Sequence, residues 1–476
     1  MTMSRRKKRR LVVTLVVLAV AAAALGLVAW NKLFREVPVV YASADEHFKY
    51  GSIGAEGPAG VPYWIWVVLP RMFPEKLPGP GGYAALGAVW EEGRELPVGF
   101  SKMRVGFDRV AINCAACHTS TVRTAPGGRP MLFAGGPSTR FQPQGYLRFL
   151  FASAADPRFN PDAVMKEIDR VVKLSWLDRA LYRYLLIPQT KRTLVKQATE
   201  DYAWMQTRPD WGPGRTDMNP FQRVVMKLPD DGTVGSTDMM AIWNERAHEG
   251  MLRHSDGMNT TLIEPVIAAA LAGGATRKSV DIEGLRRVND YLLDLPAAKY
   301  PFPVDQALAA RGGEIFSARC AECHAFGGAR TGKIIPIGEL GTDPNRMRHW
   351  PQTSADAFNR YAEGYDWKFN NFRSSQGYLS VPLDGVWARA PYLHNGSVPT
   401  LRDLLEPPEN RPKVFFRAYD VYDQAKVGFV SDGPEAAGEG FRLDTAVVGN
   451  GNGGHLFGTD LSPEEKAALV EYLKTL

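Results

Sequence analysis

The sequence is poor in cysteine and, beyond its first ten residues, has no excess of positive charge. Four cysteines among 476 residues exclude a small fold held together by many disulfides. The formal net charge is +6, yet six of the 57 lysines and arginines lie at positions 5–10. The other 51 balance the 51 aspartates and glutamates, so we expect no nucleic-acid partner. The length allows two or three domains.

The basic cluster leads into an apolar run at residues 11–30. Only Thr14 and Gly26 interrupt these aliphatic and aromatic residues, and the run is long enough to cross a bilayer as a helix. Basic residues before such a helix stay in the cytoplasm. A cleavable signal peptide is the alternative, but no polar segment with a small-x-small site follows the run. We predict that residues 1–36 form a cytoplasmic tail and a single-pass anchor in the bacterial inner membrane, with the rest of the chain in the periplasm.

Two C-x-x-C-H segments contain every cysteine of the chain. They are Cys114-Ala-Ala-Cys117-His118 and Cys320-Ala-Glu-Cys323-His324. In this order, two thiols form thioethers with the haem vinyl groups and the imidazole that follows binds the iron. A zinc site would need further Cys or His residues nearby, but the other six histidines are scattered. We predict two covalently bound haem c groups, attached through Cys114, Cys117, Cys320 and Cys323 and ligated by His118 and His324.

A weak internal repeat divides the exported part of the chain. Helical patterns at 282–295 and 462–476 both contain a Tyr-Leu pair near their end. The second pattern opens with Ser462 and Glu465 in the spacing of a capping box. The proline-rich segment 296–303 is the expected linker between two units.

The two units are predicted to be haem domains with bounds of 37–296 and 297–476. The first carries a helical insertion at about residues 144–205, whose apolar residues at helical spacing predict packing and include Val164, Ile168, Trp176 and Leu185. With 34 prolines, 46 glycines and few strand signals, the predicted class is mainly α. The expected architecture is an N-terminal transmembrane helix followed by two cytochrome c-like haem domains with long irregular loops.

The role of each haem depends on what occupies the iron face opposite the proximal histidine. A strong sixth ligand makes an electron relay, whereas an open face binds oxygen or peroxide. For the second haem the candidates are His394, His455, His349 and Met347. We favour His455, because a glycine-rich loop before the last helix is able to place an imidazole over the haem without steric conflict. A surface histidine in a loop is the alternative.

The segment 243–264 is the most informative stretch for the first haem. Glu264 lies where an apolar helix begins, and a carboxylate near a haem is able to move protons as a general acid or base. Trp243 is able to carry an electron between the haems. Each has a plainer interpretation, because a glutamate at a helix start is favourable to the helix dipole and most tryptophans belong to the core.

These segments together resemble a known group. Asp256-Gly257 followed by Glu264 resembles the distal segment of bacterial di-haem cytochrome c peroxidases, and residues 390–401 resemble the loop of their second domain. The resemblance is closer to the rubber-oxygenase-like di-haem c-type cytochromes of that superfamily. It covers most of residues 60–476 and is carried by Thr237-Asp238, Trp243-Asn244, residues 383–391 and residues 454–459.

What this resemblance implies is two haems with different roles. The first, ligated by His118, has its other face available to oxygen or hydrogen peroxide. The second, held by His324 and His455, is an electron relay. By the same resemblance, Glu264 falls at the position of the catalytic acid and Trp243 lies near the inter-haem tryptophan.

The chain departs from the peroxidase pattern after His394, where no methionine follows at the spacing of that family's second-haem ligand. This departure supports His455. We expect a membrane-anchored periplasmic di-haem oxidoreductase of peroxidase or oxygenase type, supplied with electrons by a redox donor protein or a quinol-linked donor. The alternative is a pure electron-transfer cytochrome with both irons six-coordinate. A third interpretation is long-range oxidation of a partner protein.

Overall fold

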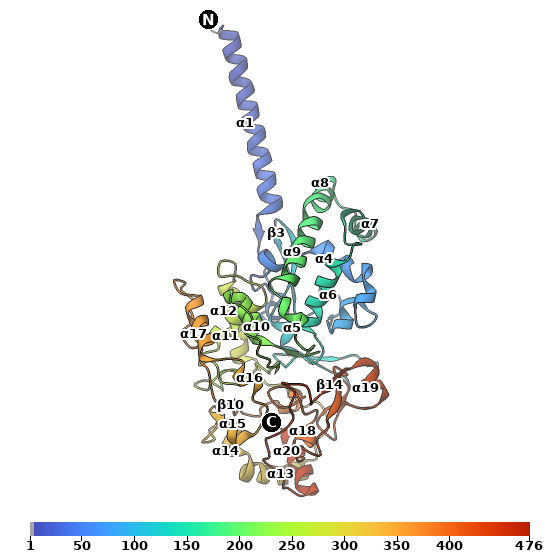
Figure 1. Ribbon diagram of the computed structural model, residues 1–476, viewed down its shortest axis with the longest axis vertical. Coiled ribbons are helices and arrows are strands. Elements are labelled where there is room, and N and C mark those ends of the chain that lie inside the picture. Colours follow the sequence, from blue (N-terminus) through green and yellow to red (C-terminus); the bar gives the residue numbers. More distant parts are fainter. Residues whose placement is uncertain (1–3) are drawn as a thin grey trace.

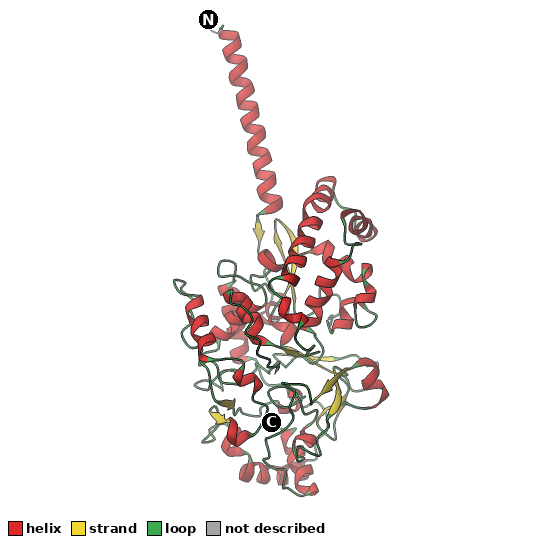
Figure 2. Cartoon of the chain, in the orientation of Figure 1, coloured by secondary structure: helices red, strands yellow, loops and turns green. Residues whose placement is uncertain are grey.

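Helix is the main secondary structure of this protein, whose computed structural model describes residues 4–476. Helices hold 44% of the residues and strands 11%, and the strands are scattered between the helices (Figure 2). The fold is therefore mixed α/β, and the predicted mainly α class is too narrow. Most of the strands have only two to four residues, too few to produce an alternating pattern in the sequence.

Helix α1 (Arg5–Leu33) extends away from one end of the body (Figure 1). Ser4 caps its first turn, and none of its residues is buried. As predicted, the helix is long and apolar enough to cross a membrane. The carbonyl of Arg35, just beyond it, accepts a hydrogen bond of 2.8 Å from the N–H of Gly106. The end of the helix is thereby fixed to the body.

A four-stranded antiparallel sheet lies between α1 and the first cysteine motif. Its order is β1 (Glu36–Val37), β3 (Phe100–Val105), β4 (Phe107–Ile112) and β2 (Val61–Pro62). Strand β4 ends just before Asn113, which is the N-cap of the short helix α5 (Cys114–Cys117). Gly99, at the start of β3, has a φ of 90° and lies so close to α5 that a Cβ would be 2.3 Å from the Cα of Ala116. The sheet therefore holds the first motif in place.

The helical insertion packs against α4 (Tyr63–Met72) in the first apolar core. It consists of α6 (Pro143–Ala155), α7 (Pro161–Val171), α8 (Trp176–Leu181), the π-helical turn η3 (Tyr182–Leu186) and α9 (Ile187–Thr199). Val164 and Ile168 are fully buried, which confirms that part of the predicted stripe. Trp176 and Leu185 are exposed, so the packing predicted for them is wrong. The π-helical turn shifts the register, and Leu186 enters the core beside Leu185.

A second apolar core joins elements from both halves of the chain. It contains residues of α2 (Ala44–Tyr50), α11 (Ile263–Ala272), α12 (Ile282–Asp294) and α17 (Gln352–Tyr361). Helix α12 buries the apolar stripe that its sequence pattern predicted. Because α17 comes from beyond residue 303, apolar packing continues across the expected linker. The bounds of the two haem domains stay a prediction.

The third core surrounds the second cysteine motif. Helix α13 (Gln306–Arg319) packs against α20 (Pro463–Leu473), which has the predicted capping box. A Cβ on Gly312 of α13 would lie 1.9 Å from the carbonyl oxygen of Ala468, so this approach requires glycine. Helix α13 leads directly into Cys320 and the short helix α14 (Ala321–His324).

The remaining elements are short and frame the loops. The helices are α3 (Glu56–Ala59), η1 (Pro74–Lys76), η2 (Gly82–Leu86), η4 (Ala203–Gln206), α10 (Met218–Met226), α15 (Ile337–Leu340), α16 (Asn345–Arg348), η5 (Val386–Arg389), α18 (Leu401–Leu404) and α19 (Gly433–Glu439). The strands form two-stranded antiparallel pairs: β5 (Thr119–Val122) with β6 (Met131–Ala134), β7 (Arg215–Thr216) with β8 (Thr237–Asp238), β9 (Ile334–Pro336) with β10 (Gly377–Leu379), β11 (Val414–Arg417) with β14 (Phe441–Asp444), and β12 (Tyr422–Asp423) with β13 (Gly428–Phe429).

Candidate haem sites

A cavity of about 590 Å³ reaches both cysteine motifs. The motif residues that line it are Cys114, His118, Cys320, Cys323 and His324. The four cysteines form no disulfide within residues 4–476, so every thiol is available for a thioether bond. The two attachment motifs, far apart in the sequence, thus face one continuous interior space.

The first motif is held by a cap and oriented by a backbone carbonyl. Asn113 accepts a hydrogen bond of 3.0 Å from the N–H of Ala115 and donates one to the carbonyl of Gly51. The Nδ1 atom of His118 lies 2.9 Å from the carbonyl oxygen of Met240. A proton on Nδ1 leaves the Nε2 lone pair free for a metal. Burial lowers the pKa of His118 to about 4, which keeps the imidazole neutral.

The second motif repeats this arrangement and adds a facing imidazole. The Nδ1 atom of His324 lies 2.8 Å from the carbonyl oxygen of Val381. The ring centre of His455 lies 6.2 Å from that of His324, with 42° between the ring planes. With metal–nitrogen bonds of about 2 Å, two imidazoles on opposite sides of one iron have ring centres about 6.3 Å apart. The separation therefore fits the pair that the sequence predicted.

The loop that carries His455 is fixed by a buried arginine. His455 has a φ of 46° and follows Gly454 at 71°, so two consecutive residues are left-handed. Arg411, only 2% exposed, donates hydrogen bonds to five carbonyl oxygens, those of Leu404, Glu406, Asn452, Gly454 and His455. No acidic side chain within residues 4–476 lies at salt-bridge distance from Arg411. No pattern in the sequence pointed to this residue.

The other candidates for the second iron have different surroundings. His349 uses both ring nitrogens, one with Asp217 and one with Thr233, so it has no lone pair to offer. Met347 is buried and does not line the cavity. His394 does line the cavity, and its ring stacks on Tyr378 with 3.9 Å between the ring centres.

The first site differs from the second because, within residues 4–476, no ring pairs with His118 as His455 pairs with His324, although burial and, to a smaller extent, charge on His118 lower the pKa of His254. His254 is the candidate for a second imidazole at the first site. The sequence did not single out this residue. It lines the cavity and has a φ of 64°. Burial lowers the pKa of His254 to about 4. Its place among the predicted distal residues, between Trp243 and Glu264, was the only signal available.

Arg346 supplies positive charge to the cavity wall. Its guanidinium lies 3.2 Å from the carboxylate of Asp256, and the two side chains are 2% and 3% exposed. The Nε and Nη1 atoms of Arg346 are buried without a hydrogen-bond partner. Two unpartnered N–H donors at the wall suit the propionate carboxylates that a haem carries. The lining of the cavity thus offers hydrogen-bond donors for the propionates as well as thiols and imidazoles for the vinyl groups and the iron.

Glu264 is held among backbone and amide donors rather than at the cavity wall. Its carboxylate accepts hydrogen bonds from the backbone N–H groups of Asn370 and Asn371 and from the side-chain amides of Asn259 and Asn371. The side chain is 6% exposed, and its neighbours Leu262, Pro265 and Val266 line the cavity without it. These contacts tie the start of α11 to the loop at 369–373.

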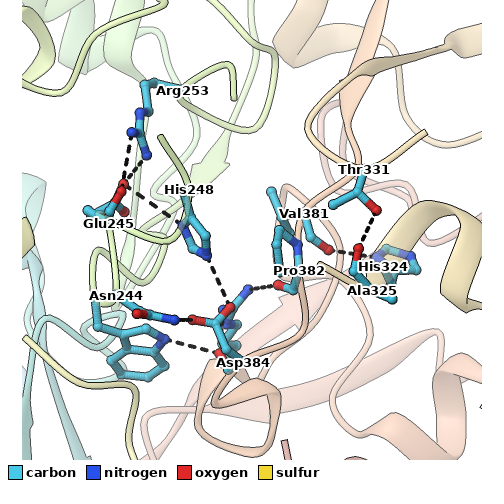
Figure 3. Close-up of polar contacts among 12 residues, drawn as sticks. Asn244, Glu245, His248, Arg253, His324, Ala325, Thr331, Val381, Pro382 and Asp384 are labelled. Atoms are coloured by element: carbon cyan, nitrogen blue, oxygen red, sulfur yellow. Dashed lines mark hydrogen bonds and ion pairs between the residues drawn. The ribbon is translucent and has the colours of Figure 1, made fainter. Parts of the chain in front are cut away.

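Trp243 is buried in the third apolar core, next to a hydrogen-bonded hub around Asp384. Its Nε1–H donates to the carbonyl of Asp384 at 3.1 Å. The Asp384 carboxylate accepts hydrogen bonds from Asn244 and Arg389 and lies 3.2 Å from His248, as Figure 3 shows beside the bond from His324 to Val381. Burial disfavours the charged carboxylate, but the hydrogen bond from His248 and the charge of Arg389 lower the pKa of Asp384.

Comparisons with known proteins place a family match on this hub. Residues 377–416 match the family described as RoxA-like, cytochrome c-like. The uncharacterized protein y4iM of Sinorhizobium fredii is 35% identical over 234 residues, which cover 43% of this chain and 52% of that protein. The uncharacterized protein y4iJ of the same organism is 47% identical over 116 residues, which cover 22% of this chain and 19% of that protein. The family match supports a place among the rubber-oxygenase-like cytochromes and indicates a haem c oxidoreductase.

Proposed function

We propose that this protein is a membrane-anchored di-haem c-type cytochrome that activates oxygen or hydrogen peroxide at its first haem and relays electrons through its second. The observation that carries the proposal is the asymmetry of the two sites. His324 faces the ring of His455 at 6.2 Å, whereas His118 has no such ring opposite within residues 4–476. An iron closed by two imidazoles relays electrons, and an iron with one open face binds a small oxidant.

Both sites have residues to hold a haem. The four motif cysteines would attach the vinyl groups, and His118, His324 and His455 would bind iron. When bound, the haem supplies one-electron chemistry at its iron. Met240 and Val381 orient the proximal imidazoles through their carbonyls, and such a hydrogen bond also raises the basicity of the ligand.

Trp243 lies on a short route between the two proximal histidines. Trp243 comes three residues after Met240, whose carbonyl holds His118. Its indole N–H donates to the carbonyl of Asp384, which comes three residues after Val381, the residue whose carbonyl holds His324. Covalent bonds and hydrogen bonds thus connect both imidazoles through one indole. This supports Trp243 as the residue that carries an electron between the haems. The proton role of Glu264 stays a prediction, which the Glu264→Gln variant tests.

The location of the protein is part of the proposal. Helix α1 would anchor the chain in the bacterial inner membrane with the haem domains in the periplasm, because its flanking basic residues favour the cytoplasm. Electrons would come from a redox donor protein or a quinol-linked donor. Oxygen or hydrogen peroxide would be the small oxidant, and the formally neutral body offers no surface for nucleic acid.

His254 favours a second candidate function, pure electron transfer. It is a half-buried imidazole on the cavity wall, and a small movement of its loop onto the first iron would close both sites. A protein of this kind would hold two six-coordinate irons and would bind no oxidant.

Carbon monoxide titration of the reduced full-length protein separates the two functions. We expect one bound carbon monoxide per chain in the wild type and two in His455→Ala, because removal of that imidazole opens the second iron. The matched variant His349→Ala, which removes a histidine bonded to Asp217, should still bind one. No binding in the wild type, together with binding in His254→Ala, would establish the electron-transfer function instead. Parallel incubations with peroxide plus a reduced cytochrome and with oxygen plus an alkene then distinguish peroxidase from oxygenase.

A further inference from the structure

The two most exposed aromatic side chains of the body lie on one segment. Trp176 is 81% exposed and Tyr184 is 76% exposed, and no other aromatic side chain within residues 41–476 exceeds 48%. Both belong to the consecutive elements α8 and η3, where Leu185 is also exposed. Soluble proteins rarely expose several large apolar side chains together unless the patch binds something.

This segment is attached to the end of α1. The ammonium group of Lys32 lies 2.6 Å from the carboxylate of Asp178 in α8. Arg104, on the sheet that follows, donates a hydrogen bond of 3.1 Å to the side chain of Asn31. Figure 1 shows α8 at the top of the body, beside the lower end of α1. The ion pair and the hydrogen bond fix the height of α8 relative to the helix that would cross the membrane.

That height coincides with the membrane surface. The apolar run of α1 ends at Trp30, two residues before Lys32. Headgroup layers extend about 5–8 Å beyond the hydrocarbon on each side, and a helical residue rises about 1.5 Å. Asp178 pairs with Lys32, and Trp176 is two residues away from Asp178, so with α1 across the bilayer the indole would lie near the depth of the headgroup layer. Tryptophan and tyrosine are the residues that concentrate at this level.

We propose that the segment 176–185 is a second membrane contact, inserting Trp176 and Tyr184 into the headgroup layer beside the anchor. The inference rests on the proposed role of α1 as an anchor. A phospholipid surface is the occupant because the segment continues the membrane-facing end of α1. Arg179 and Arg183 are partly neutralised by Asp169 and Asp162, so insertion depends on aromatic burial more than on charge.

Two contacts have a consequence that one anchor lacks. A single helix can tilt and rotate in the bilayer together with the body that is fixed to it, whereas a second contact holds the body in one orientation relative to the membrane. The cavity would then keep a constant position relative to membrane-soluble donors. Such a contact would explain why Trp176 and Tyr184 of the helical insertion lie outside the apolar cores of residues 4–476.

Photolabelling of the full-length protein in lipid nanodiscs tests the contact. The discs contain phosphatidylethanolamine and phosphatidylglycerol with a tracer phospholipid that carries a diazirine near its headgroup, and mass spectrometry locates the adducts. We expect adducts on α1 and on residues 176–185. The double variant Trp176→Ser, Tyr184→Ser should lose most adducts on that segment, keep those on α1 and keep the wild-type visible spectrum. Val448→Ser, which removes another exposed apolar side chain (61%), is the matched control and should change neither.

Adducts on α1 alone in the wild type would overturn the second contact and leave the anchor in place. An absence of adducts on both segments would overturn the anchor as well. Unchanged labelling of residues 176–185 in the double variant would show that the two aromatic side chains do not hold the segment at the membrane, and would also overturn the inference.

Discussion

The substitution Glu264→Gln distinguishes a structural carboxylate from a catalytic one. Each carboxylate oxygen accepts two hydrogen bonds: Oε1 from Asn370 N–H at 3.0 Å and Asn371 Nδ2 at 2.6 Å, and Oε2 from Asn259 Nδ2 at 2.9 Å and Asn371 N–H at 3.1 Å. Glutamine replaces one carboxylate oxygen with an NH₂ group. This group cannot accept hydrogen bonds, so two of the four donors lose their acceptor. Asn259 is buried, Asn371 is half-buried and Asn370 is exposed, so the donors that lose their partner regain water only in part.

The expected cost follows from the number of donors that are left without a partner. A fully buried donor without a partner costs about 1–3 kcal/mol, and the low end applies to these partly buried donors, so two of them weaken the closed loop by about 2 kcal/mol. Hydrogen exchange measured by mass spectrometry on the full-length protein should therefore be about 30-fold faster, or more, for the amides of the 369–373 loop, since about 1.4 kcal/mol is a factor of ten.

The matched control is Glu283→Gln on the neighbouring helix α12, where the side chain is exposed. The free energy of opening of the loop, derived from its hydrogen-exchange rates, should change by less than about 0.5 kcal/mol in this variant. If Glu264→Gln leaves the loop protected and abolishes peroxide turnover, the structural reasoning is refuted and the carboxylate acts as an acid or base.

Two further predictions concern the hub around Trp243. Gly385→Ala places a methyl group 2.7 Å from Cζ2 of Trp243 at a φ of 66°, so it should cost at least about 1–2 kcal/mol from the left-handed backbone alone. Urea unfolding should show this loss, and an equal effect from Gly338→Ala, which has nothing within 4 Å, would contradict the contact. Because the pKa of Asp384 is lowered in the folded state, its carboxylate stabilises the protein above the unfolded pKa of about 4. The stability advantage of the wild type over Asp384→Asn should therefore be complete at pH 7 and disappear as the pH falls below about 4, and a constant difference from pH 7 to pH 3 would disprove the linkage.

The sequence predicted those features that depend on neighbouring residues. The two C-x-x-C-H motifs, the capping box at Ser462 and the apolar stripe of α12 are local patterns. The sequence did not predict the hydrogen-bond partners of the two proximal histidines. These partners are the backbone carbonyls of Met240 and Val381, and every residue has such a carbonyl. No residue type marks such a partner, and only the folded chain brings it to the imidazole.

Helical periodicity alone misassigned part of the insertion. Trp176 and Leu185 continue the stripe that Val164 and Ile168 begin, and the pattern treats all four as core. The π-helical turn at 182–186 adds a residue to one turn and changes which side chains face inward. Trp176 precedes that turn, and its position beside α1 depends on the ion pair between Lys32 and Asp178, 146 positions apart in the chain.

The Arg411 guanidinium holds the His455 loop by donating hydrogen bonds to backbone carbonyl oxygens. Because these partners are neutral, a full positive charge remains beside the second site. A carboxylate in the same place would have cancelled the charge, while carbonyl dipoles only solvate it. A fixed cation close to an electron carrier favours the form with the extra electron, because the added negative charge is attracted to it. In the proposed di-haem protein, the arginine that fastens the loop would therefore stabilise the reduced form of the second haem, and transfer from a donor that reaches the cavity would run downhill toward that haem.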